Sequence, residues 1–322
     1  MKKGNTKGAR WVYNFIFPFG CQQLTIYGYF FRRVDEYRER VQSLQHLIHF
    51  HSEFDQPANT GTHAITAHLD LPSKEKKPVI EWGDEKATAL DDILLLLSIF
   101  NLRDVFAVPE PIEKGKGAIT ADSREYFFGI RTAIEYQQAQ DKNGNKYDIG
   151  FQKGIERVYS MMRTVKWQKE YRRGRFLLLF RSACKRQILE TSFITCWTIW
   201  EILFTLHNQS WLSDKQIIKL PASEKVSFVL TRYQIKDALD SRDRKGLKRF
   251  VNMRNALVHE GRFVDETAIH DVTLFVRVTA IIIAQILGLS VDDVLGSQTK
   301  FLARLRGQEV VPPWKEWGHL IG

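Results

Sequence analysis

The sequence has few of the residues and runs that mark secreted, metal-binding or membrane proteins. Its 322 residues include three cysteines, Cys21, Cys184 and Cys196. An odd number without ligand spacing argues against a disulfide framework and favours a reducing, cytoplasmic setting. No stretch approaches the roughly 18 apolar residues of a membrane span, so no membrane association is expected. The basic and apolar N-terminus lacks a small-x-small cleavage site, so a signal peptide is not expected either.

Two common catalytic signatures are missing as well. The chain has no glycine-rich loop of the nucleotide-triphosphatase kind and no nucleophile elbow. Histidines cluster in "HLIHFH" (residues 46–51) and in "THAITAH" (residues 62–68), but these spacings fit no familiar metal site. No metal and no other cofactor is therefore expected.

The composition is that of a globular protein, with 44% hydrophobic and 26% charged residues and a formal net charge of +10. Residues 1–150 contain 19 Lys+Arg and 20 Asp+Glu, whereas residues 151–322 contain 28 and 17. The basic excess thus lies in the second half of the sequence. Such asymmetry indicates a polyanionic partner, with nucleic acid as the leading candidate.

Residues 1–148 are expected to form a mixed α and β domain. Alternating β-branched and aromatic residues predict strands in "QQLTIYGYFFRR" and "THAITAHLDL", and "KPVIEW" and "REYFFGIRTAIEY" are further candidates. "TALDDILLLLSIFNL" predicts a buried helix. This domain would sense a trigger ligand or protein, restrain the second domain or choose its target, and its sequence does not decide among these roles.

The domain boundary is expected at 148/149, near the Asn-Gly turn signal of "DKNGNKYDIG". Helical patterns dominate residues 149–322, at roughly 153–173, 175–206, 222–231, 244–262 and 265–288. The predicted fold class is therefore an α+β N-terminal domain followed by an all-α helical bundle.

The segment "LKRFVNMRNALVHEGR" places an arginine on the apolar side of a predicted helix. With about 100° per residue, Phe250 and Met253 define the apolar arc and Arg254 falls within it, roughly 40° from Phe250. Asn255, His259 and Arg262 gather on the adjacent polar flank. A buried guanidinium requires a carboxylate, an interface or an anionic ligand, and Glu201 in "TIWEILF" is a candidate carboxylate.

Arg254, Asn255 and His259 are residue types that suit metal-free RNA cleavage. Histidine can exchange protons with the ribose 2′-hydroxyl or the leaving 5′-oxygen, and arginine can stabilise the charge that grows on the phosphate. Asparagine can orient the substrate without adding charge. One histidine is too few for both proton transfers, which suggests that solvent or a second copy completes the site. The structural alternative is that Arg254 bridges two helices and His259 is an ordinary flank residue.

A second basic segment precedes this helix. "RTVKWQKEYRRGRFLLLFRSACKR" (residues 163–186) contains nine basic residues and one acid, with Trp167 and Tyr171 interleaved. It predicts either an RNA-binding surface centred on Arg172, Arg173 and Arg175, with the aromatic residues stacking on bases, or a solvated helix face.

"RNALVH" resembles the Arg-polar-x-x-x-His motif of HEPN domains, with Arg254, Asn255 and His259 in the motif positions. "TSFITCWTIWEILFTL" and "SEKVSFVL" resemble the preceding helices of the Apea-like HEPN group, so the resemblance covers roughly residues 155–295.

The resemblance implies a helical bundle that forms a homodimer, in which two copies of the motif line one cleft. It also implies metal-independent endoribonuclease activity, often in toxins and anti-phage defence. Some relatives only bind, so a non-catalytic module for RNA, a nucleotide or a partner protein is the alternative. Family toxins silenced by nucleotide transfer carry a tyrosine where this chain has Gly261, which puts that control in doubt here.

Overall fold

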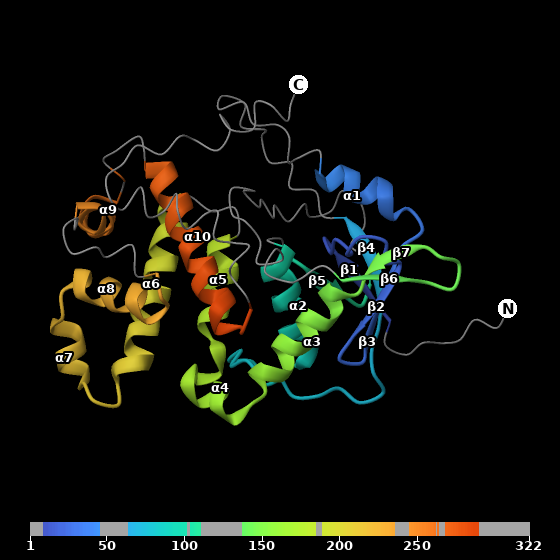
Figure 1. Ribbon diagram of the computed structural model, residues 1–322, viewed down its shortest axis with the longest axis horizontal. Helices are drawn as coiled ribbons and strands as arrows, with labels where there is room; N and C mark the ends of the chain where they lie inside the picture. The colour runs from blue at the N-terminus through green and yellow to red at the C-terminus, as the bar shows by residue number, and fades with distance from the viewer. Residues whose placement is uncertain are drawn as a thin grey trace, which may run out of the picture. The chain divides into compact units, whose positions relative to one another are not determined.

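The computed structural model describes residues 9–45, 64–101, 104–110, 137–184, 189–235, 245–261, 263 and 268–289 (Figure 1). The chain forms two compact units. The first comprises Met1–Arg186 with Leu287–Leu289, and the second comprises Gln187–Ile286 with Ser290–Gly322. The boundary expected at 148/149 therefore lies inside the first unit, because the helices of residues 150–184 pack on the N-terminal elements.

A five-stranded antiparallel sheet is the framework of the first unit. Cross-strand partners Phe31 and Leu69 are fully buried, as are Val12 and its partner Ala67. Because side chains alternate between the faces of a strand, these four residues lie on one buried face of the sheet. The strands, in the spatial order β2-β3-β4-β1-β5, are β1 (Arg10–Tyr13), β2 (Gln23–Ile26), β3 (Tyr29–Arg33), β4 (Ile65–Asp70) and β5 (Phe106–Val108).

One of two tight turns in the first unit agrees with a sequence signal. The segment "QQLTIYGYFFRR", predicted as strand without a turn, forms the β2–β3 hairpin, in which Tyr27 and Gly28 both have positive φ, 55° and 92°. The Asn-Gly turn joins β6 (Gln138–Gln140) to β7 (Lys146–Asp148), with Gly144 at φ 79°. The carboxylate of Asp141 accepts hydrogen bonds from the backbone N–H groups of two asparagines of this turn, each at 2.8 Å.

The helices of the first unit pack on this sheet or on one another. Helix α2 is nearly all core, which confirms the prediction of a buried helix there. Helix α3 packs on β2 and α5 packs on α2; the ring of Phe151 in α3 lies 6.3 Å from that of Phe100 in α2. The helical elements are α1 (Tyr37–Gln45), α2 (Ala89–Asn101), α3 (Gly150–Met162), α4 (Val165–Glu170), the 3₁₀ turn η2 (Arg172–Gly174) and α5 (Phe176–Cys184).

Asp92 is a fully buried carboxylate that joins three segments of the first unit. It accepts hydrogen bonds from the backbone N–H groups of Val79 and Ile80, from the Trp82 indole at 2.9 Å and from the Tyr159 hydroxyl at 3.1 Å. Burial raises the pKa of this carboxyl and the four donors oppose that rise. "KPVIEW", a candidate strand in the sequence, instead forms a bend, because its backbone donors are turned toward this carboxylate.

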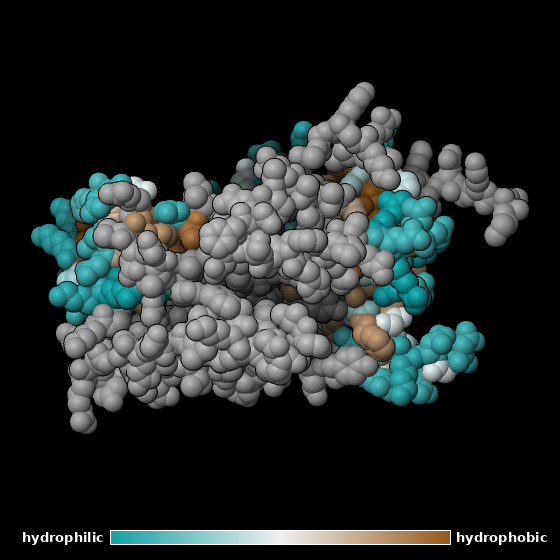
Figure 2. Space-filling model, turned by 90° about the horizontal axis from the view of Figure 1, so that it is seen from above, coloured by the Kyte–Doolittle hydropathy of each residue, from teal (hydrophilic) through white to brown (hydrophobic). Residues whose placement is uncertain are grey.

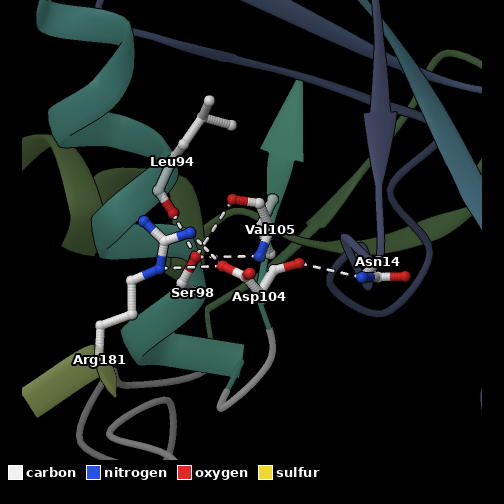
Figure 3. A network of polar contacts seen from close by, with 6 residues as sticks. All are labelled: Asn14, Leu94, Ser98, Asp104, Val105 and Arg181. Carbon is white, nitrogen blue, oxygen red and sulfur yellow. Dashed lines mark hydrogen bonds and ion pairs between the residues drawn. The ribbon is translucent and has the colours of Figure 1, made fainter. Parts of the chain in front are cut away.

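Asp104 makes a second polar junction, between α2, α5 and the end of β1 (Figure 3). Its carboxylate forms an ion pair with the Arg181 guanidinium, whose Nε donates at 2.9 Å. Its carbonyl oxygen accepts from the Asn14 side chain at 3.0 Å. The Ser98 hydroxyl donates to the Leu94 carbonyl at 2.7 Å and accepts from the Val105 N–H at 2.9 Å. Residue 181 is therefore tied to residues 14 and 104, which places α5 in the first unit.

The described residues of the second unit form helices joined by turns and loops, with no strand among them. Helix α6 contacts α8, α9 and α10. The ring of Phe275 on α10 is the centre of the aromatic core: it lies 4.6 Å from Trp200 and 4.9 Å from Phe193 on α6, and 5.5 Å from Phe250 on α9. The helices are α6 (Leu189–Asn208), α7 (Asp214–Lys219), α8 (Ala222–Arg232), α9 (Lys245–Glu260) and α10 (Ala268–Ile286).

The coarse fold prediction is confirmed: an antiparallel sheet region comes first and helices dominate the later half. The helix predicted at 153–173 is divided, since Thr164 starts a new helix by accepting a hydrogen bond from the Trp167 N–H at 3.3 Å. The helix predicted at 175–206 is described as α5 and α6, and residues 185–188 between them lie outside the described residues. The candidate strand "REYFFGIRTAIEY" lies outside the described residues. Among the helices that the structure describes, none is long and apolar enough to cross a membrane.

Candidate functional site

Helix α9 is fixed in the second unit by one face and one ion pair. Phe250 and Met253 are buried, as the helical spacing predicts. The Arg249 guanidinium Nε donates to the carboxylate of Asp271 on α10 at 2.6 Å, and the Asp271 side chain is fully buried. Because Arg249 and Phe250 are both held about one turn before Arg254, the helix presents its next turn from a fixed base.

Arg254 is half-buried on α9, at the edge of the apolar arc where the sequence predicts it. Its Nε is buried without a hydrogen-bond partner, and its Nη1 donates to the side-chain oxygen of the neighbouring Asn255 at 3.3 Å. No ion pair joins Arg254 to any carboxylate in the described part of the chain. A guanidinium has five donors, so most of the hydrogen-bonding capacity of Arg254 is unused.

Asn255 and His259 are both exposed. They are four residues apart on α9, so their side chains share one side of the helix about one turn apart. Val258, between them and the apolar face, is 53% exposed. Arg262, the fourth residue of the predicted polar flank, lies outside the described residues.

Glu201 is half-buried on α6, and its carboxylate accepts a hydrogen bond from the Trp197 indole at 3.3 Å. It forms no ion pair with Arg254. The structure therefore gives Glu201 a role within α6 and leaves Arg254 without the carboxylate suggested from the sequence.

Arg172, Arg173 and Arg175 are exposed, but they belong to the first unit and α9 belongs to the second. Trp167 and Tyr171, predicted to stack on bases, are 4% and 8% exposed and pack against each other with ring centroids 5.4 Å apart. The stacking prediction is wrong, because these rings fill the core beneath η2 instead of facing solvent.

No group of three or more metal-ligating side chains occurs among the residues that the structure describes. His68 lies beside Trp11, with ring centroids 4.2 Å apart, and burial lowers the pKa of His68, as does the positive charge of Arg32. The remaining histidines of these clusters, His46, His49, His51 and His63, lie outside the described residues.

Arg249 and Asp271, which position the site, were not predicted from the sequence. Each belongs to an amphipathic helix, where a charged residue is ordinary, and nothing in the spacing links positions 22 residues apart.

A scan against protein-family models, a search of curated proteins and a search of solved structures found no match to this chain.

Proposed function

We propose that this protein is a metal-independent endoribonuclease of the HEPN type, acting in the cytoplasm as a toxin or anti-phage effector, with α9 as its catalytic helix. The observation that carries the proposal is the half-buried guanidinium of Arg254, which has unused donors beside Asn255 and one turn before the exposed His259. Burying a cation without a counter-charge costs stability. An RNA phosphate would supply the missing acceptor and negative charge.

In the proposed reaction, a histidine takes the proton of a ribose 2′-hydroxyl and the 2′-oxygen attacks the adjacent phosphorus. The bond from phosphorus to the 5′-oxygen breaks, and the leaving oxygen takes a proton from the conjugate acid. The products are a 2′,3′-cyclic phosphate and a 5′-hydroxyl. Arg254 stabilises the charge on the non-bridging oxygens, and Asn255 holds the guanidinium or the ribose in position.

A homodimer would supply the second histidine that this reaction requires, with one His259 as base and the other as acid. The exposure of Val258 supports such pairing, since an apolar side chain beside two polar motif residues suits an interface between copies. Dimerisation also offers a water-poor setting for Arg254.

The test is cleavage of total RNA and tRNA by the purified full-length protein in EDTA. Wild type is compared with His259→Ala and Arg254→Ala, and Glu260→Ala serves as the exposed control next to the motif. We expect cyclic phosphate ends and a loss of roughly 10²–10⁴-fold in both motif variants but not in the control. Cleavage that persists in His259→Ala would refute the assignment. RNA that is bound by wild type but never cut would favour the non-catalytic module.

A further inference from the structure

The net charge differs between the two compact units, and the division is not the one between the two halves of the sequence. Residues 1–186 contain 30 Lys+Arg and 22 Asp+Glu, net +8, whereas residues 187–322 contain 17 and 15, net +2. The basic excess of the protein therefore belongs to the first unit, although it occurs in the second half of the sequence. The region responsible is the stretch from α4 to α5, together with an earlier loop.

Two exposed basic segments of the first unit make up what we call the basic surface. The loop before α2 contributes three lysines within four residues, and the α3–α5 region contributes six cations. The acids of the same segments are Glu75, Glu81 and Glu170. The nine exposed cations are Lys74, Lys76, Lys77, Arg163, Lys166, Lys169, Arg172, Arg173 and Arg175.

Direct contacts hold these two segments together, although they are about ninety residues apart. The backbone N–H of Glu81 donates to the carbonyl oxygen of Arg173 at 3.1 Å. Lys76 Nζ and Arg163 Cζ lie over the same ring, that of Tyr27, at 4.2 and 5.2 Å from its centroid. Two cations on one tyrosine place positive charge from both segments at a single point of the surface.

The backbone beneath the arginines is rigidly built. Arg172, Arg173 and Gly174 have positive φ values of 42°, 57° and 66°, so the chain makes a left-handed turn that directs consecutive arginines outward. A Cβ at Gly174 would lie 2.4 Å from Cη2 of Trp167, so the indole packs directly against the turn. The Asp92 carboxylate fixes the other segment through Val79 and Ile80.

Most of the basic surface lacks compensating charge. Apart from Arg172, none of its cations forms an ion pair with a residue that the structure describes. Clustered like charges repel one another and raise the local positive potential, which a polyanion relieves by displacing counterions. The aromatic residues of this region are buried or covered by cations, so contacts here would be made to a phosphate backbone and not by base stacking.

We infer that the basic surface of the first unit binds the phosphate backbone of RNA, as a substrate-holding surface separate from the α9 motif and without base preference. This inference deepens the proposed function and rests on it for the identity of the polyanion. One RNA would then have two contacts with the protein: the basic surface of the first unit would hold it, and α9 of the second unit would cut it.

The test measures binding of labelled RNA by full-length His259→Ala between 0.05 and 0.3 M salt (roughly the range over which counterion release is resolved). One variant also carries Lys74→Gln, Lys77→Gln, Lys169→Gln and Arg175→Gln. Its control removes the same charge from exposed lysines elsewhere, through Lys142→Gln, Lys146→Gln, Lys215→Gln and Lys219→Gln. We expect at least about 10-fold weaker binding in the first variant only, with a log–log salt slope shallower by roughly 0.7 per lost phosphate contact.

Equal losses in the two variants would overturn the inference, because net charge alone would then explain binding. Tighter binding of polyglutamate than of RNA of equal charge would overturn it in favour of an acidic protein partner. The outcome is separable from that of the proposed function. RNA held by the basic surface but never cleaved by wild type would leave this inference standing, whereas cleavage by wild type together with undiminished RNA binding by the first variant would refute it alone.

Discussion

Arg254 is a residue whose burial is unfavourable for the fold and useful for binding an anion. Arg254→Met keeps the length of the side chain and removes the unsatisfied donor, so we expect an unchanged or slightly higher free energy of unfolding, by up to about 1 kcal/mol. The same change should abolish RNA cleavage. Urea denaturation followed by circular dichroism measures the first effect.

Arg249 provides the contrasting control for that experiment. Arg249→Met removes the guanidinium that pairs with the fully buried Asp271 carboxylate, and we expect a loss of about 3 kcal/mol in the free energy of unfolding. If Arg254→Met is as destabilising as Arg249→Met, Arg254 is a structural residue, as the bridging alternative in the sequence suggests.

His68 makes the stability of the first unit pH-dependent. Burial, and then Arg32, lower its pKa in the folded state, so the unfolded chain takes up the proton first as the pH falls through about 6.5. The stability contributed by neutral His68 is thus complete above that pH and is lost as the pH falls toward the folded pKa. We expect the urea midpoint to drop between pH 7.5 and 5.5 in wild type and to drop less in His68→Gln. An identical drop in both would assign the effect to other groups.

The half-burial of Arg254 could be predicted because helical geometry alone fixes the angle between positions 250 and 254. The environment of Asp92 could not. Its position in the first turn of a helix explains an acid there by the helix dipole, and only the structure reveals that Val79, Ile80, Trp82 and Tyr159 converge on it. Local spacing carries no information about donors that arrive from distant segments.

At the scale of elements, the left-handed turn η2 lies at the junction between the helices expected at 153–173 and 175–206. Gly174→Ala would place a methyl group against Trp167 at φ 66°, so we expect a loss of about 2 kcal/mol or more. Gly144→Ala is a matched control, because it has a similar φ of 79° and nothing within 4 Å of the added Cβ, and should cost about 1 kcal/mol. Equal losses, measured by urea denaturation, would show that the backbone conformation matters and the indole contact does not.

Elements with strong local signals were predictable, and elements defined by distant contacts were not. The strand character of residues 22–33, the Asn-Gly turn and α2 follow from period and turn chemistry, whereas the turn at Tyr27 and Gly28 was not predicted. The assignment of α3 and α5 to the first unit depends on Phe151 against Phe100 and on Arg181 with Asp104, which join residues 51 and 77 positions apart. A domain boundary placed at residue 148, where the sequence changes from mixed strand and helix patterns to helical patterns, does not take these two contacts into account.

At the scale of the whole molecule, the large apolar residues that remain exposed are informative. In Figure 2, the residues coloured by hydropathy are mostly hydrophilic, and some apolar residues are visible among them. Val258 and Ile218 are both exposed on helices of the second unit, at 53% and 76%. If α9 pairs with a second copy, Val258→Asp should shift the protein from dimer to monomer by at least about 10-fold in Kd, as a charge in an interface costs more than 1.4 kcal/mol. Ile218→Asp should leave the Kd unchanged.

Analytical ultracentrifugation of the two variants and wild type measures this difference. A wild type that is monomeric at all concentrations would contradict the proposed pairing and remove the second histidine from the reaction.

The short return of residues 287–289 to the first unit has a consequence for how the protein is made. Leu287 and Leu289 are buried, and a Cβ at Gly288 would lie 2.8 Å from the Met161 sulfur, so this short segment completes the packing of the first unit. A ribosome delivers the chain N-terminus first. The hundred residues from Gln187 to Ile286 must therefore be synthesised before the first unit receives its last core side chains. A truncated product that ends between the units would lack these side chains and expose the apolar surface they cover to the cell's proteases.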